Sequence, residues 1–309
     1  MRISSASAFQ STIDNLQRRQ EALAESQSRL TTGKRVTRPS DDPAAAARAE
    51  RALAAMARTA ADQRAVEASR SLMQQAEGAL GDAGELLQQA REFVVAAGNG
   101  SYSDKERAGM ADQLRSLRSR LLAVANRDDG AGSALFGGQG SNARPFVDAP
   151  GGVRWDGMPG RMQVDAGELL PMSVDGRAAW LSAPDPTSGQ DELSVFDLLG
   201  RLADELATPG RDSTAIDEGV RAGLRDLDAA MDHLMSHRAR LGEALGRADA
   251  AGLRLSQAAL TAQTERSGAE DLDMVQAISD FQNQQTGYDA ALRTYSMVQR
   301  MSLFDYLRG

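Results

Sequence analysis

Apolar residues recur in alternating steps of four and three near both ends of the chain. The N-terminal stripe extends from Phe9 to Leu30, and the C-terminal stripe extends from Met274 to Tyr295. This spacing is typical of one seam of a coiled coil. A helix with such a narrow apolar stripe cannot bury it alone, so we expect the first and last helices to pair with each other or with other subunits.

Glutamines interrupt both stripes, at Gln20 and Gln27 in the first and at Gln285 in the second. Polar seam residues can weaken an isolated pair and fix register among neighbouring subunits, or they can be tolerated on half-exposed helices. The sequence leaves both interpretations open. The candidate assembly-interface residues are Phe9, Ile13, Leu16, Leu23, Leu30, Met274, Ile278, Phe281, Tyr288, Leu292 and Tyr295.

Capping signals divide the first half of the chain into three helices. The first is predicted over residues 7–30 with Gly33 as its C-terminal cap. A second begins at Asp41-Asp42-Pro43, a carboxylate cap followed by proline, and continues to Gly98. Ser103 and Glu106 have the spacing of a capping box, which predicts a third helix that ends near Asn126.

The helical pattern returns at residue 194, turns at Pro209-Gly210, and then forms the longest seam of the protein. That seam keeps the four-three step from Val220 to Leu255. It requires a long packing partner, for which residues 72–94 are the candidate. We expect residues 267–271 to interrupt the helix before the C-terminal stripe.

The composition changes between Gly130 and Gly189, where glycines, most prolines and both tryptophans are concentrated. Strands are expected at residues 152–155, 161–164 and 170–174 because turn residues bound each run. The short runs predict a small sheet or hairpin assembly packed on the helices rather than an independent domain.

Together these elements predict a mainly α fold: an elongated antiparallel helical bundle or coiled coil with paired terminal helices and a small β-rich insertion in the middle. The second helix alone would extend about 80 Å at about 1.5 Å per residue. The predicted segments are an N-terminal assembly helix (1–42), two halves of a helical rod (43–129 and 191–266), the β-rich domain (130–190) and a C-terminal assembly helix (267–309).

Composition narrows the possible functions. The formal net charge of -8 at pH 7, without a concentrated basic face, argues against a nucleic-acid partner. No run of apolar residues approaches the length of a membrane span, and the start of the chain lacks the pattern of a cleavable signal peptide. The chain has no cysteine, which excludes disulfides and thiolate metal sites.

Three constellations could carry chemistry, and each has a more ordinary interpretation. His233 and His237 lie one helical turn apart, but no third metal ligand follows, so a packing or surface role is favoured. Asp41-Asp42 could bind a cation, but its place before a proline favours helix capping. Gly137-Gly138-Gln139-Gly140 lacks the phosphate-loop motifs and is interpreted as a turn into the β unit.

Arg115, Arg118 and Arg120 form a local basic cluster, for which we expect a solvated helix face or a subunit contact. No nucleophile, general base or isolated carboxylate pair occurs in a catalytic arrangement. The sequence therefore predicts no enzyme activity, no cofactor and no metal.

Two terminal motifs carry a resemblance to a known family. The segments Arg29-Leu30-Thr31-Thr32-Gly33-Lys34-Arg35-Val36 and Ser40-Asp41-Asp42-Pro43-Ala44 resemble the N-terminal signature of the bacterial flagellin-like proteins. The C-terminal segments 295–299 and 302–307, with Leu135-Phe136-Gly137-Gly138, resemble the hook-filament junction proteins of that family more than the flagellins. The resemblance covers essentially the full length.

The resemblance implies a structural protein of the bacterial flagellum, exported unfolded by the type III pathway and secreted without a cleavable signal peptide. It implies a junction ring of identical subunits between hook-associated protein 1 and flagellin, with an export chaperone. Exposed seams at both ends suit a chain that is partly disordered as a monomer. Two alternatives stay open: a flagellin of the filament itself, and a cytoplasmic coiled-coil signalling or adaptor protein, against which the β insertion argues.

Overall fold

The structure is a computed structural model that describes residues 2–139, 144–160, 163–165, 168–190 and 192–307. The chain forms two compact units. The first combines Met1–Thr59 with Gln257–Gly309, and the second comprises Ala60–Ser256.

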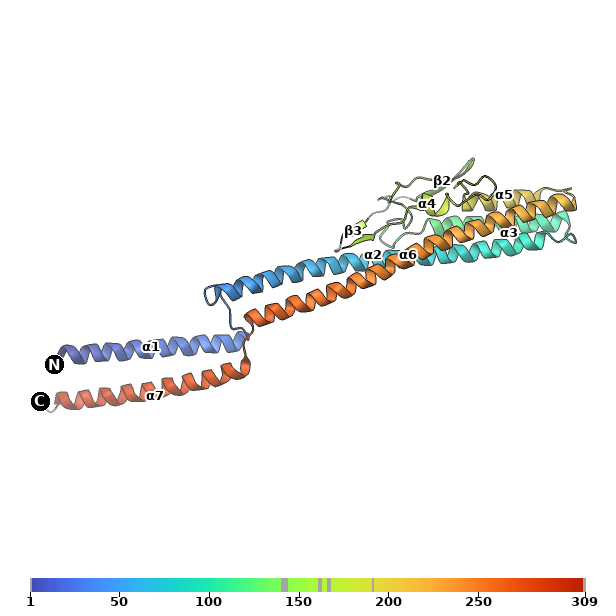
Figure 1. The fold of residues 1–309 in the computed structure, drawn as a ribbon. Coiled ribbons are helices and arrows are strands. Elements are labelled where there is room, and N and C mark those ends of the chain that lie inside the picture. Colours follow the sequence, from blue (N-terminus) through green and yellow to red (C-terminus); the bar gives the residue numbers. More distant parts are fainter. Residues whose placement is uncertain (1, 140–143, 161–162, 166–167, 191, 308–309) are drawn as a thin grey trace. The chain divides into compact units, whose positions relative to one another are not determined.

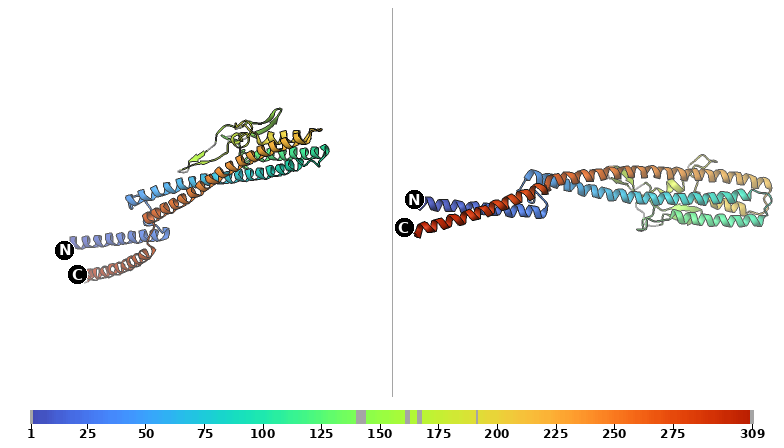
Figure 2. Two further views of the ribbon diagram at one scale, coloured as in Figure 1. Left: turned by 45° about the vertical axis from the view of Figure 1, so that its right-hand side comes forward. Right: turned by 90° about the horizontal axis from the view of Figure 1, so that it is seen from below.

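The first unit contains a pair of terminal helices, α1 (Arg2–Thr32) and α7 (Met274–Leu307). The two helices lie side by side and antiparallel, with the start of α1 beside the end of α7 (Figures 1 and 2). The predicted pairing of the first and last helices is therefore confirmed within one chain. Gly33 ends α1 with φ of +68°, and its N–H donates to the Arg29 carbonyl at 2.9 Å, as expected of a C-terminal cap.

Two long helices contribute residues to both units. Helix α2 spans Pro43–Ala97 and α6 spans Ser213–Glu270. The N-terminus of α2 is capped by Asp42, whose Oδ1 accepts from the Ala45 N–H at 2.9 Å. The capping role predicted for this carboxylate is confirmed.

In the second unit, α2 and α6 run antiparallel and are joined by a ladder of ion pairs. Arg70 pairs with Asp249, Glu77 with Arg238, and Arg91 with Asp228. These three pairs keep one antiparallel register along the helices. They confirm residues 72–94 as the partner of the long seam.

Helices α3 (Asp104–Ala125) and α5 (Val195–Ala207) complete the helical part of this unit and pack against each other. The predicted capping box at Ser103 and Glu106 is present. The turn before α3 and the turn before α6 meet, because the Gly210 N–H donates to Asp104 at 3.0 Å. The result is two helical hairpins around a common core (Figure 1).

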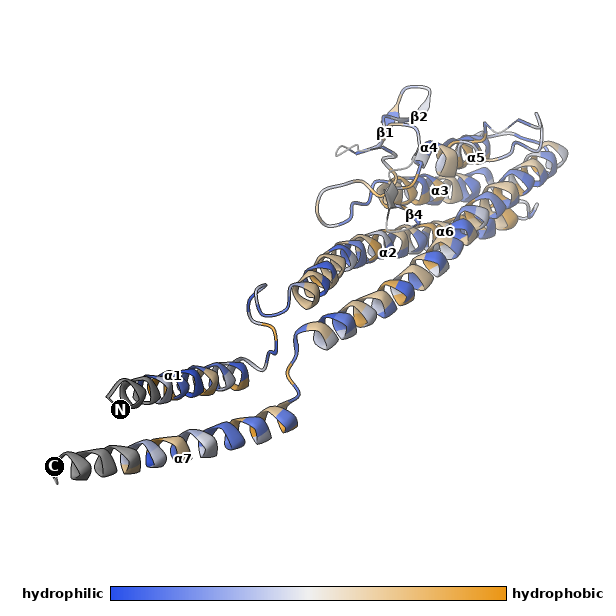
Figure 3. Ribbon diagram, turned by 60° about the vertical axis from the view of Figure 1, so that its left-hand side comes forward, coloured by the Kyte–Doolittle hydropathy of each residue, from blue (hydrophilic) through white to orange (hydrophobic). Residues whose placement is uncertain are grey.

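The core of the long helices follows a strict heptad. Every seventh residue of α2 from Ala45 to Val94 is buried, and every seventh residue of α6 from Leu227 to Ala269 is buried except Leu255, which is half-buried. Alanine occupies many of these sites, so the helices can approach closely. In Figure 3, apolar and polar colours alternate along α2 and α6.

One predicted helix boundary is wrong. Helix α6 does not stop at Ser267 but continues to Glu270, and the chain breaks only at residues 271–273. A glycine inside a helix costs only about 1 kcal/mol relative to alanine, so Gly268 does not end α6. Asp271 then accepts a hydrogen bond from the Ser267 hydroxyl, which closes the last turn.

The middle of the chain contains two antiparallel strand pairs. Strand β1 (Phe146–Ala149) pairs with β2 (Gly152–Trp155), and β3 (Gln163–Asp165) pairs with β4 (Leu169–Pro171). The strand at 152–155 was predicted correctly, whereas β1 was not predicted. Of the strand predicted at 161–164, residues 161–162 lie outside the described residues. The strand predicted at 170–174 is shorter and ends at Pro171, because proline has no N–H for the ladder.

A short helix, α4 (Gly176–Trp180), follows the strands and was not predicted. Its Trp180 is fully buried, stacks on Phe196 with ring centroids 5.5 Å apart, and meets Phe136 edge to face at 5.2 Å. Phe146 of β1 belongs to the same cluster and contacts both Trp180 and Phe196. The β-rich part therefore shares one hydrophobic core with the helices, as its thin hydrophobic supply predicts.

Candidate assembly interface

Helices α1 and α7 pair without forming a core. Of the side chains that the structure describes in them, residues 10–32 and 274–297, none is buried. In contrast, α3 alone buries seven of its residues. The contact between α1 and α7 therefore covers the two apolar stripes only in part.

On α7 the members of the predicted stripe differ in exposure. Phe281, Tyr288 and Tyr295 are half-buried, whereas Ile278 and Leu292 keep 47% and 40% of their surface exposed. Met274 is 44% exposed at the start of the helix, and the adjacent Val275 is 83% exposed. A row of apolar side chains on α7 thus remains in contact with solvent in the isolated chain.

On α1 the predicted residues Ile13, Leu16, Leu23 and Leu30 are all half-buried, and the side chain of Phe9 lies outside the described residues. The seam glutamines Gln20, Gln27 and Gln285 are all exposed in this chain.

The segment that follows α1 is hydrogen-bonded to the segment that links α6 to α7. We call these two segments, residues 33–36 and 269–272, the joint. The Arg35 N–H donates to the Glu270 carbonyl at 2.7 Å, and the Leu272 N–H donates to the Gly33 carbonyl at 2.9 Å. The Arg35 guanidinium donates to the Ala269 carbonyl at 2.8 Å and pairs with Asp42 at 3.1 Å. The two Arg35 donors satisfy carbonyls that the end of α6 leaves open.

Glu270 adds charge to the joint. Its carboxylate lies 3.1 Å from Lys34 Nζ and 2.7 Å from Arg266 Nε, and only 14% of its side chain is exposed. Lys34 and Arg35 belong to the N-terminal family signature, and Glu270 lies in the predicted interruption. Their contacts with each other's segment were not predicted, because the two segments are more than two hundred residues apart in the sequence.

Asp41 and Asp42 each have a defined structural partner. Asp41 accepts from the backbone N–H groups of Thr37 and Arg38, at 3.1 and 2.9 Å, and these bonds lower the pKa of its carboxyl. The pKa of Asp42 is also lowered, by the Ala45 N–H and then by Arg35. Both carboxylates thus shape the start of α2.

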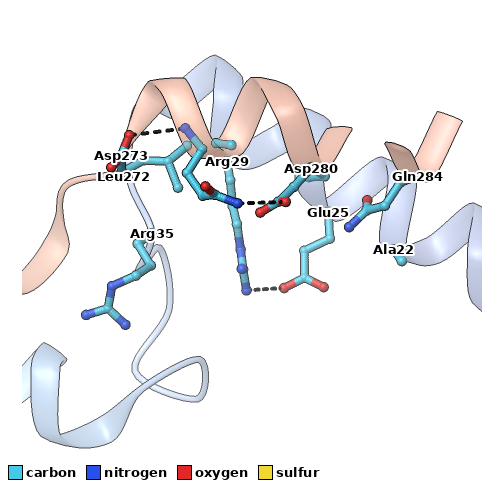
Figure 4. A pocket seen from close by; sticks show the side chains of 11 residues that line it. Ala22, Glu25, Arg29, Arg35, Leu272, Asp273, Asp280 and Gln284 are labelled. Atoms are coloured by element: carbon cyan, nitrogen blue, oxygen red, sulfur yellow. Dashed lines mark hydrogen bonds and ion pairs between the residues drawn. The ribbon is translucent and has the colours of Figure 1, made fainter. Parts of the chain in front are cut away.

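A polar hollow of about 330 Å³ lies between α1 and α7 beside the joint. Figure 4 shows Ala22, Glu25 and Arg29 on the α1 side and Asp273, Asp280 and Gln284 on the α7 side. Its charged groups already have partners: Arg29 pairs with Glu25, Asp280 accepts from Gln276, and Arg35 is bonded in the joint. The hollow is a gap in packing rather than a built ligand site.

The remaining candidates have structural roles. Arg118 forms a two-pronged ion pair with Asp148 of β1, at 2.6 and 2.7 Å, and Arg115 pairs with Asp112 and with Asp204 of α5. Arg115 is exposed, as expected of a solvated helix face, and it also joins α3 to α5. Arg118 is half-buried and joins α3 to β1, so the solvated face is wrong for Arg118 alone.

Arg120 is exposed, as expected. The turn into the β unit is at residues 135–136, closed by the Gly137 N–H on the Ala134 carbonyl at 3.3 Å, so it lies just before the predicted segment. Gly137 and Gly138 form β-bridges to Asp175 and Met158, and Gly140 lies outside the described residues. Gly138 has φ of +70°, and a Cβ there would lie 1.8 Å from a backbone oxygen, so glycine is required.

His233 and His237 lie together on α6, with ring centroids 4.7 Å apart. Within the described ranges no group of three metal-ligating side chains gathers anywhere, and the part of the chain that is described holds no helix long and apolar enough to cross a bilayer.

Both ends of the chain match known protein regions. Residues 3–141 match the bacterial flagellin N-terminal helical region, and residues 224–307 match the bacterial flagellin C-terminal helical region. The "Flagellar hook-associated protein 3" of Salmonella typhimurium is 30% identical over 100% of both chains. A "Flagellin" of Bacillus subtilis is 25% identical, over 91% of this chain and 90% of its own.

A solved structure has the same fold. The crystal structure of the flagellar junction protein FlgL from Legionella pneumophila superimposes with a TM-score of 0.56 at 18% identity, covering 61% of this chain and 94% of that chain. The second alternative, a coiled-coil signalling or adaptor protein, does not agree with these matches. From its two flagellin-type helical regions and its full-length similarity, the chain belongs to the flagellar hook-associated protein 3 family of flagellar structural proteins.

Proposed function

We propose that the chain is the subunit of a junction ring that connects the hook to the flagellin filament. On one side the ring contacts hook-associated protein 1, and on the other it contacts flagellin. Full-length similarity to a hook-associated protein 3 supports the junction role over the filament role, for which the identity is lower. The residues of this ring bear contacts rather than chemistry.

The observation that carries the proposal is the incomplete burial of the terminal pair. Two long helices meet without one buried side chain among those described, and α7 presents Met274, Ile278 and Leu292 to solvent. Exposed apolar stripes at heptad spacing are stabilised when other helices cover them. Assembly would provide that cover, from neighbouring copies and from the adjoining flagellar proteins.

We further propose a role for each of the segments predicted from the sequence. Residues 1–42 and 267–309 serve assembly, residues 43–129 and 191–266 form the self-sufficient helical body, and residues 130–190 form the insertion. The chain would be exported unfolded by the flagellar type III pathway with an export chaperone, and would act outside the cell. The absence of cysteine is compatible with this route, because no disulfide has to form after export.

A double substitution tests the interface. Phe281→Asp with Leu292→Asp should prevent incorporation into flagella while the helical body stays folded by circular dichroism, because charges would then occupy apolar contacts. The matched control is Gln282→Asp with Ala290→Asp, which places the same charges at exposed positions of the same helix. Normal filament attachment in the first variant would refute the assignment.

Hydrogen exchange tests the state of the free subunit. Amides of the terminal stretches should exchange rapidly, and those of residues 72–124 and 220–255 should be protected, because only the latter lie on a buried core. Uniform protection along the chain would contradict the assembly role of the ends.

A gene deletion separates the junction role from the flagellin role. The deletion strain should form hooks without filaments and should shed flagellin into the medium. The purified protein should also fail to polymerise into long filaments on seeding, whereas a flagellin should polymerise. Filament growth from the purified protein would favour the flagellin alternative.

A further inference from the structure

Helices α1 and α7 are joined to the rest of the chain by connections of very different length. Residues 271–273 alone connect α6 to α7, whereas residues 33–42 connect α1 to α2. The short connection leaves α7 little freedom to move along its own axis. The longer one could extend to about 30 Å, whereas a shift of one heptad along a helix needs only about 10 Å. The covalent connection therefore permits α1 to slide outward along α7 by one heptad or more.

The contact between α1 and α7 does little to prevent such a shift. None of the side chains described in residues 10–32 and 274–297 is buried, so no interlocked core favours one alignment of the two helices. Both apolar stripes repeat at heptad spacing, and a shift of one heptad therefore places apolar residues opposite apolar residues again. The register of the pair has to be determined outside the stripes.

The joint keeps the longer connection folded against the end of α6. The Arg35 N–H donates to the Glu270 carbonyl at 2.7 Å, and the Arg35 guanidinium donates to the Ala269 carbonyl at 2.8 Å. The Leu272 N–H donates in the opposite direction, to the Gly33 carbonyl at 2.9 Å. Residues that directly follow α1 are thus hydrogen-bonded to residues that directly precede α7.

The remainder of residues 33–42 is also held in place. Val36 is buried. The Asp41 carboxylate accepts from the backbone N–H groups of Thr37 and Arg38, at 3.1 and 2.9 Å, and these bonds close a tight loop before α2. Extension of the connection would break these contacts together with those of the joint. The folded connection therefore holds the end of α1 at one position along α7.

A contact further along the pair has the same register as the joint. The Arg19 guanidinium of α1 lies beside Gly287 of α7, where a Cβ would come within 2.8 Å of it. This contact lies nearly the same number of residues from Gly33 along α1 as from Leu272 along α7. The alignment that is present at the joint thus continues along both helices.

We propose that the joint sets the register of α1 against α7 and that Arg35 is its positioning residue. The guanidinium is suited to this role because it bonds to Ala269 at the end of α6 and to Asp42 before α2. A single register presents the exposed apolar side chains of α7 in one position relative to α1. The use of that position for a ring rests on the proposed junction role, whereas the register itself is a property of the single chain.

Disulfide formation measures the register, because the chain has no cysteine of its own. Ala22 of α1 and Gln284 of α7 both line the hollow between the helices (Figure 4). Ala22→Cys with Gln284→Cys reports the register of the structure, and Ala22→Cys with Ala291→Cys reports an outward shift of one heptad. In dilute full-length protein under mild oxidation, the first pair should close within one chain about tenfold faster than the second.

Removal of the guanidinium should abolish this preference. Arg35→Gln should lower the ratio of the two rates by about tenfold, the factor that one charged hydrogen bond supplies. Arg35→Met, which keeps an aliphatic stem of similar length, should give the same loss. The matched control is Arg38→Gln, which removes the same charge from an exposed position of the same connection and should keep the ratio.

Four results would overturn the inference: equal rates for the two cysteine pairs, closure of neither pair, a ratio that survives both Arg35 substitutions, or an equal loss in Arg38→Gln. Helical circular dichroism and amide protection of residues 72–124 and 220–255 establish in every variant that the helical body is folded. Intramolecular closure is measured on the single chain, so failure of the register inference and failure of the junction role are distinguishable.

Discussion

Substitution of the exposed apolar side chains of α7 tests how much they contribute to the free energy of assembly. The change is a triple substitution, Met274→Ala, Ile278→Ala and Leu292→Ala, which keeps good helix formers throughout. All three side chains belong to the first unit, so the core of the second unit is untouched.

The expected loss of assembly free energy follows from the exposed fractions of these three side chains. The three side chains keep 44%, 47% and 40% of their surface in water, which together is slightly more than one whole side chain. Full burial of one such side chain stabilises by about 1.5–3 kcal/mol, so covering the row is worth about 2–4 kcal/mol per subunit. At about 1.4 kcal/mol per tenfold, affinity should fall about 30-fold to 700-fold.

Competition provides the assay. When the variant and the unsubstituted protein are expressed together at equal levels, the variant should form less than about one-tenth of the subunits in isolated hook–filament junctions. A matched triple, Ser279→Ala, Gln282→Ala and Asn283→Ala, alters exposed polar positions of the same helix and should incorporate normally. Equal incorporation of both triples would refute the reasoning.

Three further outcomes follow from the second unit and are measurable by urea unfolding. Leu87→Ala should lower the free energy of unfolding by about 2–5 kcal/mol, because Leu87 is fully buried. Ser103→Ala should cost about 0.5–2 kcal/mol by removing a capping box. Arg118 holds the pKa of Asp148 below its ordinary 3.8. That pair therefore contributes stability above this pH, which is lost as the pH falls further, and Asp148→Asn should remove this part of the acid dependence.

Local signals in the sequence predicted most of the helical framework. Asp42 before Pro43 and the Ser103–Glu106 box start helices where expected, because each cap is satisfied by its own N-terminal turn. The α6 boundary failed because Gly268 is tolerated inside a helix. Strand β1 was not predicted because a run of four residues does not reveal its partners. These partners are β2 and the Asn126 side chain, which accepts from the Phe146 N–H at 2.9 Å.

The candidate assembly interface was also predicted from the sequence only in part. Periodicity found the apolar stripes on α1 and α7, since heptad spacing is a property of each segment alone. It could not show which members of the α7 stripe face α1 and which face solvent, because helix rotation is set by the partner. The joint was missed entirely, because Arg35 meets Ala269 across more than two hundred residues of chain.

The sequence by itself determined the long helices, their N-terminal caps and the two seams, because hydrophobic period and capping act over one to four residues. Only the tertiary structure decided that the described residues of the terminal pair form no buried core, that the joint links the two chain segments at its base, and that α4 is hydrogen-bonded to His233 of α6. Those features depend on distant segments brought together, and burial, charge and hydrogen bonding act there through space rather than along the chain.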